Sequence, residues 1–259
     1  MVNLGINTGR SEGKRENDRF YDLAERNGVL VLAGWECCDK WEAAAKTGGE
    51  PWNDADMRVA KASMASEARL LRNHPSVIGF YIGSDHAPPP ALSKMYTDTL
   101  RGEGWTLPVI SAAVAEATAE AGPSGMKMAG PYDWIPPSYW YADKLGAAFG
   151  FDSEVSAGAV IPRLEDLQRM LSVQEQEALW KYPEARQYHA SADGSTFAVL
   201  TPVDIALAKR YGAPRDLADY VAKAQLDNYD NVRAQFEACN ARMGADKRAT
   251  GGKIGRAKG

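Results

Sequence analysis

Two carboxylate residues, Asp85 and Glu154, stand where the sequence changes from apolar to polar. Asp85 closes the run Val77–Asp85, Glu154 closes the run Ala147–Glu154, and both runs are apolar and contain aromatic residues. Short runs of this kind predict strands that are buried on both faces of a parallel sheet. Ligands of alternating α/β proteins bind at the carboxyl ends of such strands, so we expect both carboxylates at a functional edge.

A carboxylate at the end of a strand also has structural uses. It can cap the following helix or pair with an arginine, and these roles are about as common as catalysis. By residue type alone, Asp85 is equally compatible with the structural and the catalytic role. Asp85 and Glu154 are 69 residues apart (154 − 85 = 69), so only folding can bring their side chains together.

The elements that must position these carboxylates alternate along the chain. We expect strands at 3–10, 29–35, 77–85, 108–113 and 147–154. We expect helices at 18–27, 56–72, 91–101, 164–170, 173–180, 203–211 and 217–240. This order predicts a right-handed parallel α/β fold, either an eight-stranded barrel or an open sheet. The first strand lacks a following glycine-rich phosphate loop, which argues against a nucleotide-binding sheet.

Composition narrows the function classes. The chain has 259 residues and a net charge of −4, which does not favour a nucleic-acid partner. No apolar run approaches the ~20 residues of a membrane span, and the N-terminus has no signal-peptide pattern. Cys37, Cys38 and Cys239 are too few for a disulfide framework or a zinc site. Cys37 and Cys38 are interpreted as small residues near a strand end, with half of a metal or redox site as the alternative.

One long segment, 122–144, combines glycine and proline with many aromatic residues. A long loop of this composition within an α/β chain is usually functional. Its aromatic residues are Tyr132, Trp134, Tyr139, Trp140 and Tyr141.

Several separated segments together resemble the catalytic barrel of the family 2 glycoside hydrolases, and most of all its exo-β-D-glucosaminidase branch. The similarity extends from about Asn3 to about Asn240. The segments are Glu12–Lys14, Gly34–Asp39, Ile82–Asp85, Gly125–Met128, Gly130–Asp133 and Phe151–Gly158.

The resemblance implies a fold, an activity and residue roles. The fold would be a (β/α)8 TIM barrel carried among β-sandwich domains. The activity would be retaining hydrolysis that removes terminal β-D-glucosamine from chitosan or chito-oligosaccharides. Glu154 matches the nucleophile, Asp85 the general acid/base, and Glu12 a residue that holds the substrate ammonium. The pair Ser84–Asp85 is a mark of the glucosaminidase branch.

Further substrate contacts are expected near the strand ends. Glu36 and Asp39 are alternatives to Glu12 for pairing with the ammonium, and Trp35 is either a substrate contact or a core residue. Tyr132 and Trp140 offer flat faces for sugar rings. The oligosaccharide substrate is the expected partner, and no metal or organic cofactor is implied.

The barrel is expected to be incomplete in this chain. The first barrel strand would lie before Met1, and the seventh and eighth strands would follow Asn240. The β-sandwich domains of a parent protein are expected to be missing as well. We therefore expect a partial catalytic barrel over 1–240 and a basic, glycine-rich, disordered tail over 241–259. Two alternatives remain: a β-mannosidase-like enzyme of the same family, and a catalytically inactive carbohydrate-binding fragment.

Overall fold

The computed structural model describes residues 2–12, 15–34, 40, 52–128, 130–142, 150–155, 158–185 and 200–242. The chain divides into two compact units, Met1–Met128 and Ala129–Gly259, and each has its own hydrophobic core. Within the part of the chain described, no helix combines the length and apolar character that crossing a membrane requires.

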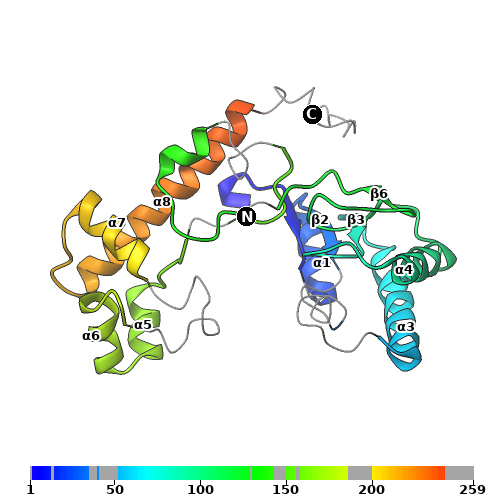
Figure 1. The fold of residues 1–259 in the computed structure, drawn as a ribbon, viewed down its shortest axis with the longest axis horizontal. Helices are drawn as coiled ribbons and strands as arrows, with labels where there is room; N and C mark the ends of the chain where they lie inside the picture. The colour runs from blue at the N-terminus through cyan, green and yellow to red at the C-terminus, as the bar shows by residue number, and fades with distance from the viewer. Residues whose placement is uncertain are drawn as a thin grey trace. The chain divides into compact units, whose positions relative to one another are not determined.

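The first unit is built around a parallel sheet whose strands alternate with helices (Figure 1). Its strands are β1 (Thr8–Arg10), β2 (Leu30–Gly34), β3 (Val77–Tyr81) and β4 (Val109–Ile110). Its helices are the 3-10 helix η1 (Val2–Leu4) and the α-helices α1 (Asp18–Arg26), α3 (Asp54–Leu71) and α4 (Pro90–Gly102). An antiparallel hairpin of β5 (Ala117–Thr118) and β6 (Gly122–Pro123) follows.

The strands of the parallel sheet lie side by side in their order along the chain, β1-β2-β3-β4. Each strand is parallel to the next. A doubly wound sheet reverses its strand order at a switch point, whereas the strands of a (β/α)8 barrel follow one another in sequence. The order confirms the parallel α/β fold, although the described residues do not form a closed barrel.

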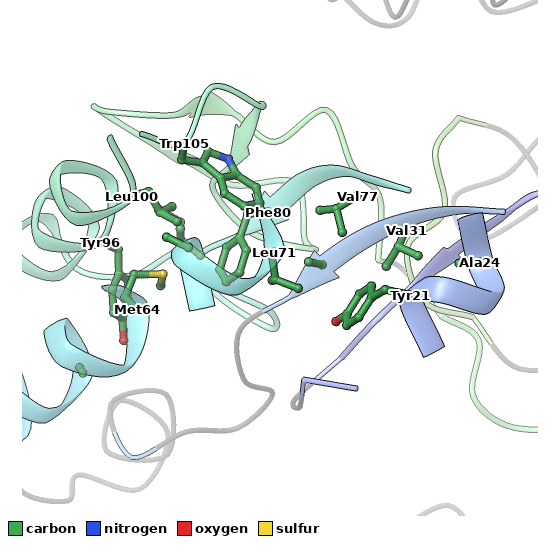
Figure 2. Close-up of a cluster of buried hydrophobic side chains, with 14 of the residues drawn as sticks. Tyr21, Ala24, Val31, Met64, Leu71, Val77, Phe80, Tyr96, Leu100 and Trp105 are labelled. Carbon is green, nitrogen blue, oxygen red and sulfur yellow. The ribbon is translucent and has the colours of Figure 1, made fainter. Parts of the chain in front are cut away.

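The sheet is apolar on both faces. On one face, strand residues pack with residues of α1, α3 and α4 in the larger core cluster (Figure 2). There the ring of Phe80 meets Trp105 edge to face, with ring centroids 5.8 Å apart. On the other face, Leu32 and Tyr81 pack with Met126. Burial on both faces is what the apolar run that starts at Val77 predicts, and it is confirmed for β3.

A capping box explains why α3 begins two residues before the predicted position. The Asn53 side chain accepts hydrogen bonds from the backbone N–H groups of Ala55 and Asp56, at 2.8 and 3.1 Å. The Asp56 carboxylate accepts in return from the Asn53 N–H at 2.9 Å. These bonds satisfy donors that the first turn of a helix leaves without partners.

The second unit is helical in the residues described. Its elements are the 3-10 helix η2 (Pro137–Tyr141) and the α-helices α5 (Leu164–Met170), α6 (Val173–Lys181), α7 (Thr201–Tyr211) and α8 (Leu217–Arg242). The helices α5 to α8 share a core that includes Leu167, Leu179, Leu207 and Tyr220. The predicted helices agree with these four to within two residues at each end.

In the residues that the structure describes, the expected strand at 147–154 is reduced to a single β-bridge residue, Asp152. Residues 147–149 lie outside the described residues, and the rest of the segment 150–155 contains bends and no strand element. An extended segment becomes a strand only where a neighbouring strand supplies ladder hydrogen bonds, which a local apolar pattern cannot reveal. The expected strands at 3–10 and 108–113 are shorter than predicted, at Thr8–Arg10 and Val109–Ile110.

Candidate active site

Asp85 lies in the loop between β3 and α4, beyond the carboxyl end of β3. Its neighbour Ser84 is buried, and the Ser84 carbonyl accepts a hydrogen bond from the Ala113 N–H at 3.1 Å. The N-cap residue of α4 is Pro89, whose side chain has no hydrogen-bond acceptor. Asp85 is therefore not the capping residue of α4, so the structure does not support the capping alternative.

Gly83 allows this loop to turn tightly. A Cβ at this position would lie 2.3 Å from the carbonyl oxygen of His86 and 2.9 Å from that of Ser111. Both oxygens belong to the backbone, which cannot move aside as a flexible side chain would. The backbone conformation of the loop that carries Asp85 therefore requires glycine at position 83.

Arg10 joins the carboxyl ends of β1 and β3. Its Nη2 donates to Ser84 Oγ at 2.8 Å, and its Nη1 lies 3.3 Å from Glu12 Oε2. The guanidinium lies over the Tyr81 ring, 5.3 Å from the centroid, and the Arg10 side chain is 11% exposed. A planar guanidinium with several donors suits this arrangement, because it can orient a hydroxyl and a carboxylate at the same time.

The ring of Tyr81 packs against the guanidinium of Arg10. Its hydroxyl donates to Met126 Sδ at 3.3 Å, and burial raises the pKa of Tyr81 to about 12, while the Arg10 charge lowers it. The phenol therefore stays neutral at all physiological pH values.

Glu154 lies in the bend after residue 152 and is half-buried. The Tyr132 hydroxyl donates to Glu154 Oε1 at 3.0 Å. A donor of this kind fixes the orientation of the carboxylate. Tyr132, which the sequence suggested as a flat face for a sugar, thus acts through its hydroxyl on the candidate nucleophile. Glu154 does not cap α5, because α5 begins ten residues later, at Leu164.

Trp140 is not available as a sugar platform. It is 1% exposed and packs in a cluster with Ala234 and Ala238 of α8. Its indole N–H points to Asn231 Oδ1 at 3.3 Å. A buried indole has no free face for a ring to stack on, so the prediction that Trp140 contacts a sugar is wrong.

The aromatic segment before Ala142 instead binds along α8, and Figure 1 shows η2 beside this helix. The contacts are hydrogen bonds from aromatic N–H and O–H groups to acceptors spaced along α8. They join Trp134 to Asp227 at 2.6 Å, Trp140 to Asn231 at 3.3 Å and Tyr141 to Glu237 at 2.7 Å. The polar tip of a buried aromatic side chain needs a partner, and α8 supplies one for Trp140, while the exposed Tyr141 adds a hydrogen bond at the surface.

Some predicted residues lie outside the part of the chain that the structure describes. These are Trp35, Glu36, Cys37, Cys38 and Asp39, together with residues 243–259 of the predicted tail. The first two residues of that tail, Ala241 and Arg242, are not disordered but end α8. Among the described residues there is no group of three or more His, Cys, Asp or Glu that could hold a metal ion.

Arg10 and Glu116 contribute to the site although they were not among the predicted site residues. Arg10 ends a short strand directly before the polar segment that contains Glu12. A cation at the end of a strand could have indicated that Arg10 belongs to the site. Glu116 gives no such signal. Its carboxylate contacts the loop of Asp85, but the alanine-rich sequence around it, from Ala112 to Ala119, contains no motif that indicates this contact.

The chain is similar to exo-β-D-glucosaminidases over nearly all of its length. It is 54% identical to the enzyme of Streptomyces avermitilis over 253 residues, which are 96% of this chain and 28% of that protein. It is 43% identical to the enzyme of Hypocrea virens over 97% of this chain and 30% of that protein. The chain thus spans less than a third of the length of these relatives. No family model matches it.

Solved structures agree with this similarity. The crystal structure of the Amycolatopsis orientalis exo-chitosanase CsxA matches with a TM-score of 0.86 and 51% identity, over 92% of this chain and 28% of that one. Two variants of CsxA, one with an aspartate and one with a glutamate replaced by alanine, are described in complex with PNP-β-D-glucosamine. A β-D-mannosidase from Dictyoglomus thermophilum matches at TM-score 0.64 and 16% identity, over 90% of this chain and 29% of that one, which shows the fold alone.

Proposed function

We propose that the chain carries the catalytic carboxylates of a retaining exo-β-D-glucosaminidase. Over 96% of its length it is homologous to a segment of such an enzyme. The substrate class is chitosan or chito-oligosaccharides with a terminal β-D-glucosamine. The single observation that carries the proposal is this identity, because it covers the segments around both Asp85 and Glu154.

Glu154 is the nucleophile and Asp85 the general acid/base in this proposal. In a retaining glycosidase one carboxylate attacks the anomeric carbon while the other carboxyl group protonates the leaving oxygen, across a separation of about 5–5.5 Å. Tyr132 supports the role of Glu154, since its hydroxyl orients Oε1 at 3.0 Å. The CsxA variants with glucosaminide support an aspartate and a glutamate as the pair.

The proposed architecture is a (β/α)8 barrel to which residues 1–240 contribute a part. The sequential parallel order of β1 to β4 supports it, because this is the order of neighbouring barrel strands. Asp85 and the Arg10 network then lie at the carboxyl ends of the strands, where catalytic groups of barrel enzymes are found.

Recognition of the substrate ammonium is assigned to Glu12. Ser84, which the sequence suggested as a substrate contact, is buried and serves instead as the partner of Arg10. Glu12 is partly exposed, and Arg10 contacts its Oε2, so the remaining Oε1 is the oxygen available to a cation. Arg10 also holds Ser84 Oγ, so it fixes both groups relative to each other.

The test is hydrolysis of an aryl β-glucosaminide by the purified chain, with an aryl β-mannoside as the comparison substrate. We expect glucosaminide turnover that is lost in Glu154→Gln, a change that keeps the shape of the side chain and removes its charge. Faster mannoside than glucosaminide turnover would overturn the sugar assignment. Undiminished turnover in Glu154→Gln would overturn the nucleophile.

We propose as a second candidate a carbohydrate-binding chain without activity of its own. The chain spans 28% of the length of its Streptomyces avermitilis relative. On this alternative, the chain binds glucosamine in a calorimetric titration but turns over neither aryl glycoside.

A further inference from the structure

We propose that Glu116 is a positioning residue that fixes the loop bearing Asp85. The inference rests on the proposed role of Asp85 as general acid/base, and it concerns a residue that does not itself touch the substrate. Glu116 lies after β4, directly before the hairpin of β5 and β6, and it reaches across to the loop between β3 and α4.

The Glu116 carboxylate binds the two residues that follow Asp85. Its Oε2 accepts a hydrogen bond from the backbone N–H of Ala87 at 2.6 Å, a short distance typical of a charge-assisted bond. Its Oε1 lies 3.3 Å from Nδ1 of His86. One carboxylate therefore holds the backbone at 87 and the side chain at 86.

Glu116 is itself held firmly at its backbone. Its carbonyl oxygen accepts from the Ser111 hydroxyl at 2.8 Å and from the Ser124 N–H at 2.9 Å. Both serines are buried. Because the Glu116 backbone is held in place, its carboxylate can restrain the loop that it contacts.

Asp85 is consequently held from both sides along the chain. Before it, the Ser84 carbonyl accepts from the Ala113 N–H at 3.1 Å. After it, Ala87 donates to Glu116. Both partners come from the segment after β4, so this segment sets the backbone position from which the Asp85 side chain projects.

The first experiment measures amide hydrogen exchange at Ala87 in the full chain. The variants are Glu116→Ala, which removes the acceptor, and Glu116→Gln, which keeps an acceptor oxygen at the same reach. Glu120→Ala is the matched control, because Glu120 also accepts from a residue of another segment, Ser93 Oγ at 2.6 Å. We expect faster exchange at Ala87 in Glu116→Ala, and near-native exchange in Glu116→Gln and Glu120→Ala. Unchanged exchange at Ala87 in Glu116→Ala would overturn the proposal.

The second experiment measures kcat and KM for the aryl β-glucosaminide in the same variants. In Glu116→Ala we expect kcat to fall on the order of 10- to 100-fold with KM nearly unchanged, because a misplaced acid affects the transition state more than substrate binding. Glu116→Gln should restore most of kcat. A fall in kcat that Glu120→Ala reproduces would show a general loss of structure and overturn the positioning role. Absent turnover in the unaltered chain would contradict the proposed function, while the exchange result still decides the role of Glu116.

Discussion

At the scale of single residues, side chains of the candidate site accept hydrogen bonds from residues that are distant in the sequence. Arg10 donates to Ser84 across 74 residues, and Tyr132 donates to Glu154 across 22. The bond from Tyr132 orients an oxygen of the proposed nucleophile, and the bond from Arg10 fixes the residue before Asp85. Catalysis depends on such preorganised geometry, so substitution of these supporting residues should also lower turnover.

Tyr132→Phe tests the support of Glu154. The change removes the hydroxyl that donates to Oε1 and leaves the ring in place. We expect kcat on the aryl β-glucosaminide to fall by roughly 10- to 100-fold, since a hydrogen bond to a charged group is worth about 1.5–3 kcal/mol. Tyr141→Phe is the control, because its hydroxyl binds Glu237 on α8 and should not affect turnover. Equal losses in the two variants would contradict the assignment.

Thr97→Val tests a buried hydroxyl in α4. Thr97 is fully buried, and its Oγ1 has no hydrogen-bond partner among the described residues. Valine has nearly the same shape and removes the cost of burying this group, so the free energy of unfolding should rise by about 1 kcal/mol. In the control Thr99→Val, the lost hydroxyl donates to the Met95 carbonyl at 2.7 Å, and no gain is expected. Urea denaturation measures both variants, and a loss of stability in Thr97→Val would show that the hydroxyl has a partner.

At the scale of elements, the strand β3, its loop and α4 form the part of the fold that carries Asp85. The strand ends at Tyr81, the loop turns at Gly83, and α4 begins at Pro90, where a proline suits the first turn because its missing N–H is not needed. The segment after β4 contacts this loop through Ala113 and Glu116. Position and orientation of the acid thus come from two adjacent βα connections.

Gly83→Ala tests whether the turn depends on glycine. The added Cβ would lie 2.3 Å from the His86 carbonyl oxygen, so the loop must move. We expect turnover to fall by at least about 100-fold, as a displacement near 1 Å in a reacting group can cause. Gly102→Ala is the control at the end of α4, where a Cβ would meet nothing within 4 Å. The measurements are turnover kinetics and thermal melts of both variants. Native turnover in Gly83→Ala would refute the requirement for glycine in this turn.

The helix α8 is the element that organises the second unit. It contributes Tyr220, Val221 and Ala224 to the core and supplies acceptors to Trp134 and Trp140. Burial raises the pKa of Asp227, while the hydrogen bond from Trp134 and the Arg210 charge lower it. The aromatic segment is therefore explained chiefly by packing on α8, with Tyr132 as its contribution to the proposed chemistry.

At the scale of the whole molecule, two units with separate hydrophobic cores contribute to stability. Within each unit, ionisable side chains form hydrogen bonds between neighbouring elements. Asp204 of α7 accepts from the Tyr220 hydroxyl of α8 at 2.8 Å. Burial raises the pKa of Asp204 to about 6, and the bond from Tyr220 opposes this only in part. The chain should consequently show a pH-dependent stability in the weakly acidic range.

The sign of that dependence follows from the raised pKa. The folded carboxyl group binds its proton more tightly than the unfolded one, whose pKa is 3.8, so Asp204 stabilises the fold fully below that value. The contribution is lost as the pH rises through about 6. For a partly exposed group the loss is at most about 3 kcal/mol, and solvent screening reduces it further.

Asp204→Asn should flatten this part of the stability curve. The amide keeps an oxygen for Tyr220 but does not titrate, so the fall in the free energy of unfolding between about pH 4 and pH 6 should be smaller. Asp219→Asn is the comparison, because Arg215 and Lys223 lower the pKa of Asp219 and its contribution is lost only at lower pH. Urea denaturation at several pH values measures both slopes, and an unaltered slope in Asp204→Asn would contradict the role of Asp204.

Local sequence patterns determined the elements that chain neighbours specify. The apolar run from Val77 predicted β3, and the helical spacing of Met57, Ala60, Met64 and Ala68 predicted α3, because burial of one face follows directly from periodicity. The alternation of strands and helices predicted a parallel α/β fold, and the sheet order confirms it. Six separated segments, among them those around Asp85 and Glu154, together indicated the relatives that the comparisons found.

Only the tertiary structure decided which side chains meet. The burial of Trp140 against α8, the hydrogen bond from Tyr132 to Glu154 and the link from Arg10 to Ser84 all join residues far apart in sequence. An aromatic residue looks the same in the sequence whether its face is open to a sugar or packed on a helix. The physical reason is that hydrogen-bond partners and neighbouring strands are supplied by the fold, and local periodicity carries no record of them.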